Sequence, residues 1–499
     1  MWIALPLLAL AGCDGTGDDS ADSAVASFPA GIVARADGWL RGDLHTHTTY
    51  DGGGEDVGTV IALAEYLADP VFLDAHPEYA DDHLDYLSIT DHRTVAQQDD
   101  VDYHSDALIL VGGEEFGSDG HAGAHGITEF VDHDPDDDAT SLADLVAAIE
   151  HTHDQGGAFS PNHPFLPSIK WPWDTRDHDG VEVWNAGWGL MAPDTTPQDL
   201  DEWEAEHGIA ASATYRRAVD AQGSGAAFQS LAWVEAQLMR GQHKAVIGGS
   251  DRHVVLLPGF PTTYVRARTP DEAGVVQGIR DRHTFISRNP AAAQVLVSVT
   301  VDGTTYGLGD AIPLAGETEL TLDVRVGRAD GGRLRVIGGA AVATDEALAT
   351  AELGTRWHEQ DVVGDDTTVS LTRTVAPGDW FYPMVLEPLI APGATAEQAD
   401  VVRTLALRSA ATAEEDFTGL AEVFLELVDQ DVLWNGLYCD PVLWQADKLQ
   451  CFPPDDEGLA SFFVPDLLDR GLNAVSENGG LTDWCMGAIG SPILFTQAP

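Results

Sequence analysis

The stretch WLRGDLHTH (residues 39–47) decides the fold, because an apolar, strand-like run ends here in two histidines that are two residues apart. Successive side chains of an extended segment point to opposite faces, so His45 and His47 point the same way and can bind one metal ion. An isolated His-x-His is more often a surface or structural feature than a metal site. The interpretation of this pair therefore depends on which residues end the other strand-like runs.

Short apolar runs alternate with helical patterns beyond this stretch. Asp56–Ala68 and Ser141–His153 are helix-like, and a long amphipathic stretch surrounds Tyr215–Arg240. Leu84–Thr90 and Ala245–Gly249 are two of the strand-like runs between them. Strands that alternate with helices predict an α/β fold, either a barrel or a doubly wound sheet.

From about residue 291 the pattern changes to alternating apolar and polar residues, separated by Asp-Gly and Gly-Gly turns. Runs such as Gln294–Val301 and Glu319–Val326 are typical of antiparallel strands. Residues 395–477 have a more helical pattern, and Ile489–Phe495 is typical of a closing strand. We therefore expect a small antiparallel β-domain, followed by a partly helical C-terminal region.

Five strand-like runs of the first half end in histidine, aspartate or glutamate. The C-terminal ends of barrel strands converge on one mouth, where active sites usually lie. Imidazole and carboxylate ligands without thiolates suit zinc, manganese or iron, and the supply here exceeds the needs of one ion. We therefore expect a centre of two or three divalent ions. The residues at these ends are His45 and His47, Asp91 and His92, Glu114 and Glu115 with His121 close behind, His163, and Asp251 with His253.

In this order the motifs resemble those of the PHP (polymerase and histidinol phosphatase) family of metal-dependent hydrolases, especially its CehA/McbA-type subgroup, over residues 39–290. The segment at residues 282–290 is also similar to the one that leads into the β-domain of the subgroup. The resemblance implies a distorted (β/α)7 barrel with two or three divalent ions at the strand ends. It implies phosphoester hydrolysis, or carbamate or aryl ester hydrolysis as in some members. The family order H-x-H, T-D-H, G-x-E, G-H, H-P, E-x-x-N, G-S-D-x-H is matched by His45/His47, Asp91-His92, Glu115, His121, His163, Glu182 with Asn185, and Asp251/His253.

Two positions differ from the family pattern or leave a choice. The family has an aspartate five residues after the second histidine, whereas Asp51 stands four residues after His47, so Asp51 is a provisional ligand. Glu114 and Glu115 compete for the G-x-E position, and the spacing from the preceding glycine favours Glu115.

His121 and His125 compete in the same way. The family histidine stands five residues before a glycine, as His121 does before Gly126, so His121 is preferred. Histidines without a motif around them, such as His104, are interpreted as surface or helix residues.

A divalent cation lowers the pKa of its bound water toward neutrality, so a metal-bound hydroxide can attack an ester without a protein nucleophile. We expect Glu115, Asp251 and His163 to be catalytic, with Glu115 bridging two ions. The expected metal ligands are His45, His47, Asp51, His92, Glu115, His121, His163, Asp251 and His253.

Residues around these ligands have predicted roles of their own. Asp91 and Asn185 are expected to orient the ligands from behind. Arg252 and Arg288 are candidates for binding the phosphate of a substrate, although a salt bridge is an equally good role for either.

The composition excludes several classes of protein. The chain has 499 residues with 25 Lys+Arg and 82 Asp+Glu, a net charge of −57. So acidic a surface repels phosphate backbones, which makes nucleic acid a poor partner. The resemblance implies a small-molecule ester as the substrate. No G-x-S-x-G and no Gly-Lys dipeptide occurs, so a serine hydrolase elbow and a Walker A loop are absent.

The N-terminus predicts export. Residues 1–12 form an apolar run too short for a membrane span, which takes about 20 residues. The run is typical of a signal peptide. Leu10-Ala11-Gly12-Cys13 resembles a bacterial lipobox, which implies a lipidated Cys13, a cell envelope lipoprotein and membrane contact through the lipid anchor alone. A plain signal peptide or an uncleaved, buried N-terminus are the alternatives.

The three later cysteines are Cys439, Cys451 and Cys485. In an oxidising compartment an odd number leaves one over, and the nearest two in sequence, Cys439 and Cys451, are the expected disulfide.

The predicted function is that of a secreted, lipid-anchored metal-dependent hydrolase, most consistent with a phosphoesterase. The alternatives are a carbamate or aryl ester hydrolase with the same site and a non-catalytic metal-binding surface lipoprotein. The predicted organisation is a signal peptide with lipobox (1–13), an acidic flexible tether (14–30), a PHP-like metallohydrolase domain (31–290), a β-rich domain (291–390), and a helical insertion with a closing strand (391–499).

Overall fold

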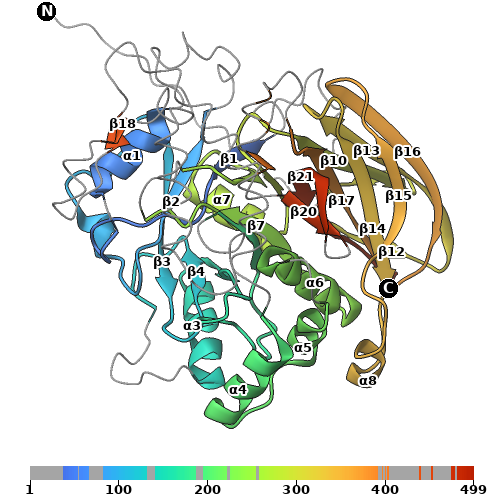
Figure 1. Cartoon of the computed structure of the whole chain (residues 1–499), viewed down its shortest axis with the longest axis horizontal. Helices are drawn as coiled ribbons and strands as arrows, with labels where there is room; N and C mark the ends of the chain where they lie inside the picture. The colour runs from blue at the N-terminus through green and yellow to red at the C-terminus, as the bar shows by residue number, and fades with distance from the viewer. Residues whose placement is uncertain are drawn as a thin grey trace, which may run out of the picture.

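The computed structural model describes most of the chain between residues 38 and 390 and its last strands (Figure 1). The predicted signal peptide, the tether and Cys13 lie outside the described residues. Among the described residues, no helix is long and apolar enough to cross a bilayer. The described residues are 38–53, 55–66, 83–131, 141–186, 195–221, 225–253, 258–390, 396, 399, 402–403, 438–439, 451–452, 474–477 and 480–498.

Three parallel strands form the centre of the first half: β1 (Trp39–Asp43), β2 (Tyr86–Ile89) and β3 (Ile109–Phe116). All four residues of β2 are buried, as expected for a parallel strand covered on both faces. Tyr86 packs in one apolar cluster with residues of α7 (Glu272–Arg280), and Leu87 in another with residues of α1 (Val57–Tyr66). The two helices therefore cover opposite faces of the sheet.

The neighbouring strands of this half are largely antiparallel. β3 pairs with β4, β4 with β5, β1 with β8, and β8 with β9, all in antiparallel fashion. Five residues separate β3 from β4, too few for the crossover that parallel strands need. These strands are β4 (Ala122–His125), β5 (Ala158–Pro161), β8 (Thr262–Arg266) and β9 (Thr284–Ser287).

The predicted closed barrel is not confirmed by the strand pairing. The large sheet runs as an open path with β5 at one end, and β6 (Gly180–Asn185) and β7 (Ala245–Gly249) form a separate parallel pair. The fold of this half is mixed α/β, as predicted. Its remaining helical segments are η3 (Ala96–Asp99), α3 (Leu142–Asp154), α4 (Pro197–His207), α5 (Ala213–Val219) and α6 (Ala226–Met239).

Two helical segments differ from the sequence-based expectations. The stretch around Tyr215–Arg240 contains two helices, α5 and α6, and Gly225 with a positive φ begins the second. Helix α4 was not predicted, although Thr196 and Asp199 form a capping box and Pro197 occupies the first turn.

The antiparallel strands expected from residue 294 onward are present. A sheet of four strands has the order β11-β10-β13-β16, and β14, β15 and β17 extend the large sheet. Asp302 and Gly303 connect β10 to β11 with positive φ angles of 51° and 84°, the conformation that an Asp-Gly hairpin turn requires. These strands are β10 (Gln294–Val301), β11 (Thr304–Tyr306), β13 (Thr318–Gly327), β14 (Arg333–Ala340), β15 (Thr355–Asp361), β16 (Asp366–Val375) and β17 (Asp379–Pro388).

An apolar core lies between these two sheets. Val297 and Val324 of the four-stranded sheet belong to one buried cluster with Val336 and Val385 of the large sheet. The arrangement is that of a β-sandwich. Figure 1 shows it on one side of the molecule, with helices α3 to α6 on the other. The short helix α8 (Asp345–Leu348) lies at its edge.

The last described strands connect the two halves. β21 (Gly480–Gly490) pairs with β9 of the first half and with β17 of the sandwich. A closing strand is present, but its bounds differ from the expected Ile489–Phe495: Pro492 has no N–H to donate, and the segment divides into the end of β21 and β22 (Ile493–Gln497). β22 pairs with β12 (Ala311–Leu314) and β17.

The predicted disulfide lies in a part of the chain of which the structure describes only backbone. β18 (Tyr438–Cys439) and β19 (Cys451–Phe452) pair with Cys439 opposite Cys451, and their side chains are outside the described part. The disulfide stays a prediction, which a non-reducing peptide map will test. Cys485 is buried on β21, with its sulfur 3.7 Å from the carbonyl oxygen of Glu387. Another short strand, β20 (Ala474–Glu477), pairs with β21.

Candidate metal centre

The strand ends meet at one edge of the sheet because the backbone pairing continues past them. Thr46 forms a parallel bridge with Arg252, and His92 forms one with Glu115. β4 runs antiparallel to β3, so His121, directly before β4, lies at the edge where β3 ends. β5 reverses direction again, and His163 follows it at the same edge.

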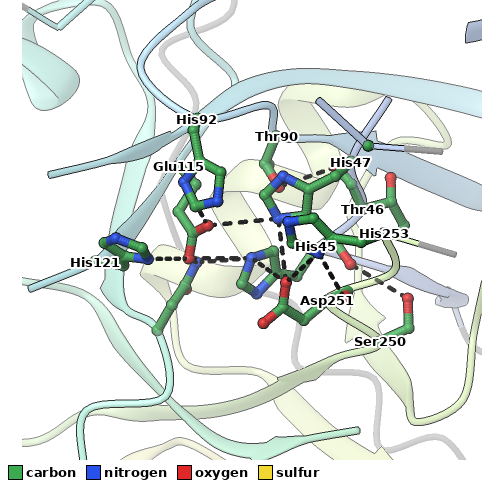
Figure 2. Close-up of polar contacts among 12 residues, drawn as sticks. His45, Thr46, His47, Thr90, His92, Glu115, His121, Ser250, Asp251 and His253 are labelled. Carbon is green, nitrogen blue, oxygen red and sulfur yellow. Dashed lines mark hydrogen bonds and ion pairs between the residues drawn. The ribbon is translucent and has the colours of Figure 1, made fainter. Parts of the chain in front are cut away.

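The carboxylate of Glu115 is at the centre of the site (Figure 2). Glu115 is fully buried, and its oxygens are within 3.4 Å of imidazole nitrogens from both sides. Its Oε1 is 3.1 Å from His45 Nε2, and its Oε2 is 3.1 Å from His92 Nδ1. The histidines around it are His45, His47, His92, His121 and His163.

Asp251 is the second carboxylate of the site. Its Oδ1 is 3.2 Å from His47 Nε2, 3.5 Å from His45 Nε2 and 3.3 Å from His253 Nδ1. Asp251 and His163 both have positive φ, of 48° and 28°. Non-glycine residues adopt this conformation at a cost, and such strain concentrates at functional sites.

The side chains form three overlapping groups, in each of which the ligand atoms lie within 4.8 Å of one another. All six predicted histidine ligands contact Glu115 or Asp251 directly, and His163 does so beside the three groups. The overlap means that ions bound to these groups would be neighbours and would share ligands. The groups are His45, His47, Glu115 and Asp251; His92, Glu115 and His121; and His47, Asp51, His92 and His253.

Unsatisfied atoms show that these residues fit metal ions. Buried atoms without a hydrogen-bond partner include His47 Nε2, Glu115 Oε2, His121 Nδ1 and Asp251 Oδ1. Each such atom costs about 1–3 kcal/mol when nothing compensates it. The four face one another across the same cluster, and imidazole and carboxylate are the donor set of zinc, manganese and iron.

The charges of the site compensate one another. Burial by itself lowers the pKa of His45, but the carboxylates of Glu115, Asp251 and Glu182 outweigh it and raise that pKa well above its ordinary value. Burial likewise lowers the pKa of His47, but the neighbouring carboxylates of Asp251 and Asp51 outweigh it and raise that pKa to about 9. The buried imidazoles and carboxylates therefore stabilise each other's charged forms.

The pKa values of the two acids, Glu115 and Asp251, are lowered instead. Burial raises the pKa of Glu115, but the imidazoles of His45, His121 and His92 outweigh it and hold that pKa well below its ordinary value. His92 differs from its neighbours because burial lowers its pKa to about 4. Its imidazole is therefore neutral at pH 7, the form that binds a metal.

Asp51 lies behind the histidines in this structure. Its Oδ2 is 2.6 Å from His47 Nδ1 and accepts a hydrogen bond of 2.8 Å from the backbone N–H of His92. His47 and His92 both belong to the third group. Asp51 thus orients both histidines, and it is also close enough to be a ligand in that group.

The predicted orienting residues have different partners. Asn185 Nδ2 donates to Asp251 Oδ2 at 3.1 Å, so it holds a ligand directly. Asp91 accepts hydrogen bonds from the N–H and hydroxyl of Thr48, at 2.6 and 2.8 Å, and fixes the turn after His47. Burial and the charge of Asp51 raise the pKa of Asp91 to about 6.

The two candidate phosphate-binding arginines form ion pairs with acids. Arg252 Nη1 is 3.0 Å from Glu55 Oε2, and Arg288 Nε is 2.9 Å from Glu387 Oε2. Both arginines are buried, and Arg288 directly follows β9 and pairs with a residue of β17. The structure thus shows the salt bridge, the second of the two roles considered for them.

The two competing residues of the sequence motifs lie apart from the cluster. Glu114 is on the opposite face of β3, where it accepts a hydrogen bond from the Val131 N–H and burial raises its pKa to about 8. His125 lies between the hydroxyls of Ser88 and Ser160, at 3.4 and 3.3 Å, and burial lowers its pKa to about 3.

Three polar residues near the ligands had no role assigned from the sequence. Asn162 donates to Glu115 Oε1 at 3.0 Å, and Asp43 accepts the backbone N–H of His45 at 3.0 Å. Glu182 Oε1 is 2.9 Å from His45 Nδ1. Asn162 and Asp43 stand one and two residues before a ligand, which was the available signal. Glu182 belonged to the E-x-x-N match, but its position behind His45 is a tertiary feature.

Comparisons with known proteins add little to what the geometry of the site shows. No protein family model matches the chain. No curated protein matches it either. One similar solved structure is a two-domain protein from Bacteroides vulgatus, described as containing a predicted PHP-like metal-dependent phosphoesterase. The match covers 69% of this chain and 90% of that chain, with 15% identity and a TM-score of 0.30, too slight a likeness to assign a fold or function.

Proposed function

We propose that this protein is a metal-dependent hydrolase that cleaves phosphoesters at a centre of two or three divalent ions, in a fold of the PHP type and its CehA/McbA-type subgroup. The observation that supports this most directly is the surroundings of Glu115. A fully buried carboxylate that contacts five imidazoles, beside buried ligand atoms without hydrogen-bond partners, has the chemistry of a shared metal ligand.

The ions would be held by the three groups, with His163 beside them. Any two of the groups share one ligand, which is Glu115, His47 or His92. Zinc, manganese or iron bound there would lower the pKa of a water molecule and neutralise charge that develops on the attacked ester. Neighbouring side chains of the protein hold the ligating carboxylates in place. Asn162 fixes one oxygen of Glu115, and Asn185 fixes one oxygen of Asp251, which leaves the other oxygens directed into the cluster.

The exposed side of the cluster indicates where substrate enters. The side chains of His253, His92 and His121 are 32%, 27% and 12% exposed, whereas those of Glu115 and Asp251 are at most 1% exposed. A substrate therefore approaches between these three histidines. The rest of the cluster forms the closed floor of the site.

The charge of the site favours an anionic substrate. The carboxylates of the three groups belong to Glu115, Asp251 and Asp51, and Glu182 behind His45 adds a fourth, so three divalent cations would exceed their negative charge. Arg252, which stands between Asp251 and His253, is already paired with Glu55. A centre loaded with three ions would therefore keep positive charge that a phosphoester can neutralise, which a neutral carboxyl ester cannot do.

The test is metal analysis of the purified protein together with a panel of esters: p-nitrophenyl phosphate, a phosphodiester, an aryl carbamate and an aryl carboxyl ester. We expect at least two equivalents of metal and phosphate release that a chelator abolishes. Turnover of the carbamate or carboxyl ester alone would replace phosphoesterase by the alternative reaction. Bound metal without any turnover would indicate a metal-binding protein, and a protein without metal affinity would reject the proposal.

Export and lipid anchoring are part of the same proposal and rest on the sequence alone. A lipidated Cys13 would attach the enzyme to a cell envelope membrane, with the tether of residues 14–30 between lipid and fold. Replacing Cys13 with Ala should release the protein from membranes. An exported protein whose intact mass includes an unmodified Met1 would contradict the anchor.

A further inference from the structure

Glu182 is a buried carboxylate that contacts the site at three points without belonging to any of the three ligand groups. Its Oε1 is 2.9 Å from His45 Nδ1. Its Oε2 accepts hydrogen bonds from the His163 N–H at 2.8 Å and from Asn185 Nδ2 at 3.0 Å. Both oxygens of Glu182 therefore contact either a predicted ligand or Asn185, which holds the predicted ligand Asp251.

An irregularity in β6 makes these contacts possible. Residues three apart on a regular strand point to opposite faces, so Glu182 and Asn185 should not meet. The register of β6 against β7 shifts between Glu182 and Trp184, and the two side chains hydrogen-bond to each other. Such irregularities redirect side chains and are common beside active sites.

The neighbouring glycine shows how closely the parts fit. A Cβ atom on Gly249, at the end of β7, would lie 2.3 Å from the Cβ of His45 and 2.9 Å from Glu182 Oε1. No larger residue fits between them. The backbone of β7 is therefore shaped around the contact of His45 with Glu182.

We propose that Glu182 is the positioning residue of the ion position formed by His45, His47, Glu115 and Asp251. It accepts the proton of His45 Nδ1, so that Nε2, which faces Glu115 and Asp251, is the nitrogen that would bind an ion. Through Asn185 the same carboxylate also holds Asp251. Carboxylates that orient a ligating imidazole in this way fix its tautomer and raise its affinity for metal.

The inference rests on the proposed metal centre and deepens it, because it assigns one carboxylate to one ion position. Glu182 touches neither His92 nor His121 in any described contact. The group formed by those histidines with Glu115 should therefore not depend on Glu182. A change at this residue should weaken one ion position and spare the other.

The test is a zinc titration of the full-length Glu182→Gln variant against a competing chelator, with bound metal counted by mass spectrometry. Glutamine has one acceptor oxygen where three donors converge, and its own N–H groups face other donors. We expect the affinity of one zinc equivalent to fall about 10- to 100-fold, the effect typical of such partners, while the remaining zinc binds as in the wild type. Wild-type affinity for every equivalent would overturn the proposal.

A second variant distinguishes positioning from a general structural role. If Glu182 acts through His45, then Glu182→Gln should weaken zinc binding little further in a His45→Ala background. If the losses of zinc affinity caused by Glu182→Gln and His45→Ala add in full, the proposal is overturned. Glu182→Asp serves if the glutamine variant does not fold: it keeps the charge but cannot span both His45 and the His163 N–H, so the same selective loss is expected.

Glu114→Gln is the matched control, because Glu114 is a buried glutamate outside the cluster. It should bind zinc as the wild type does, and an equal loss in this variant would overturn the proposal. The zinc readout does not depend on turnover. A wild type that binds zinc but hydrolyses no phosphoester contradicts the proposed function, while the zinc comparison still decides the role of Glu182.

Discussion

The α/β half and the β-sandwich bury polar side chains in different ways. In the α/β half, buried imidazoles and carboxylates converge on Glu115, and several of their atoms have no hydrogen-bond partner. In the sandwich, the core is built from residues such as Val324 and Val385, and Arg335 pairs with Glu359 of the adjacent strand. Buried polar atoms without partners are uncommon in native proteins, so their concentration in one half locates the function there.

The largest effect is expected from a change in the α/β half, at Glu115. Replacing Glu115 with Gln keeps the shape of the side chain but removes the negative charge that two of the three groups share and that five imidazoles contact. We expect at least one metal equivalent to be lost. Hydrolysis of p-nitrophenyl phosphate should fall about a thousandfold or more, because a bound ion contributes several kcal/mol to catalysis. Metal counting and steady-state kinetics measure both, and full metal content with full turnover would show that the site is assigned wrongly.

The next effect concerns a polar pair that serves stability rather than metal binding. Arg288→Met leaves the Glu387 carboxylate buried without its arginine, which should lower the free energy of unfolding by about 3–5 kcal/mol. Denaturant unfolding measures the loss. Below the unfolding transition, we expect unchanged metal content and an unchanged KM. A large rise in KM with little loss of stability would instead assign Arg288 to substrate binding.

A smaller effect contrasts Glu114 with Glu115, adjacent residues on opposite faces of β3. Burial raises the pKa of Glu114 to about 8, so the folded protein keeps a proton there that the unfolded chain loses above about pH 4.5. Between these values the folded state binds more protons, and this group makes stability fall as the pH rises.

Glu114→Gln removes the titration and should flatten that part of the pH profile. The unfolding free energy of the variant minus that of the wild type should increase from pH 5 to pH 8, by up to about 1.4 kcal/mol per pH unit. Denaturant unfolding of both proteins at matched pH values measures the difference. A constant difference across this window would show that Glu114 has an ordinary pKa.

The smallest effect is expected at His104, an exposed histidine outside every motif. His104→Ala should change the free energy of unfolding by less than about 0.5 kcal/mol, as surface substitutions usually do. Metal content and turnover should stay at wild-type values. If this variant lost metal while Glu115→Gln kept it, the assignment of the metal centre to the histidines around Glu115 would be wrong.

Local patterns were sufficient to predict several parts of the structure. Alternating apolar residues and the Asp302-Gly303 turn indicated the antiparallel strands of the sandwich. Polar residues at the ends of apolar runs indicated the side chains that meet at Glu115, including His45 and His163. Such signals are available from the sequence because strand periodicity and turn chemistry depend on neighbours along the chain.

The sequence by itself therefore determined which residue types stand at the strand ends, and so the kind of chemistry that this protein can perform. Only the tertiary structure decided that β4 runs antiparallel to β3, that β21 lies between β9 and β17, and that Glu182 lies behind His45. Pairing between segments distant in the chain depends on how the whole core packs, and a local irregularity such as that in β6 leaves no periodic signal. The same is true of the unsatisfied atoms around Glu115, which arise only when five separate segments are buried together.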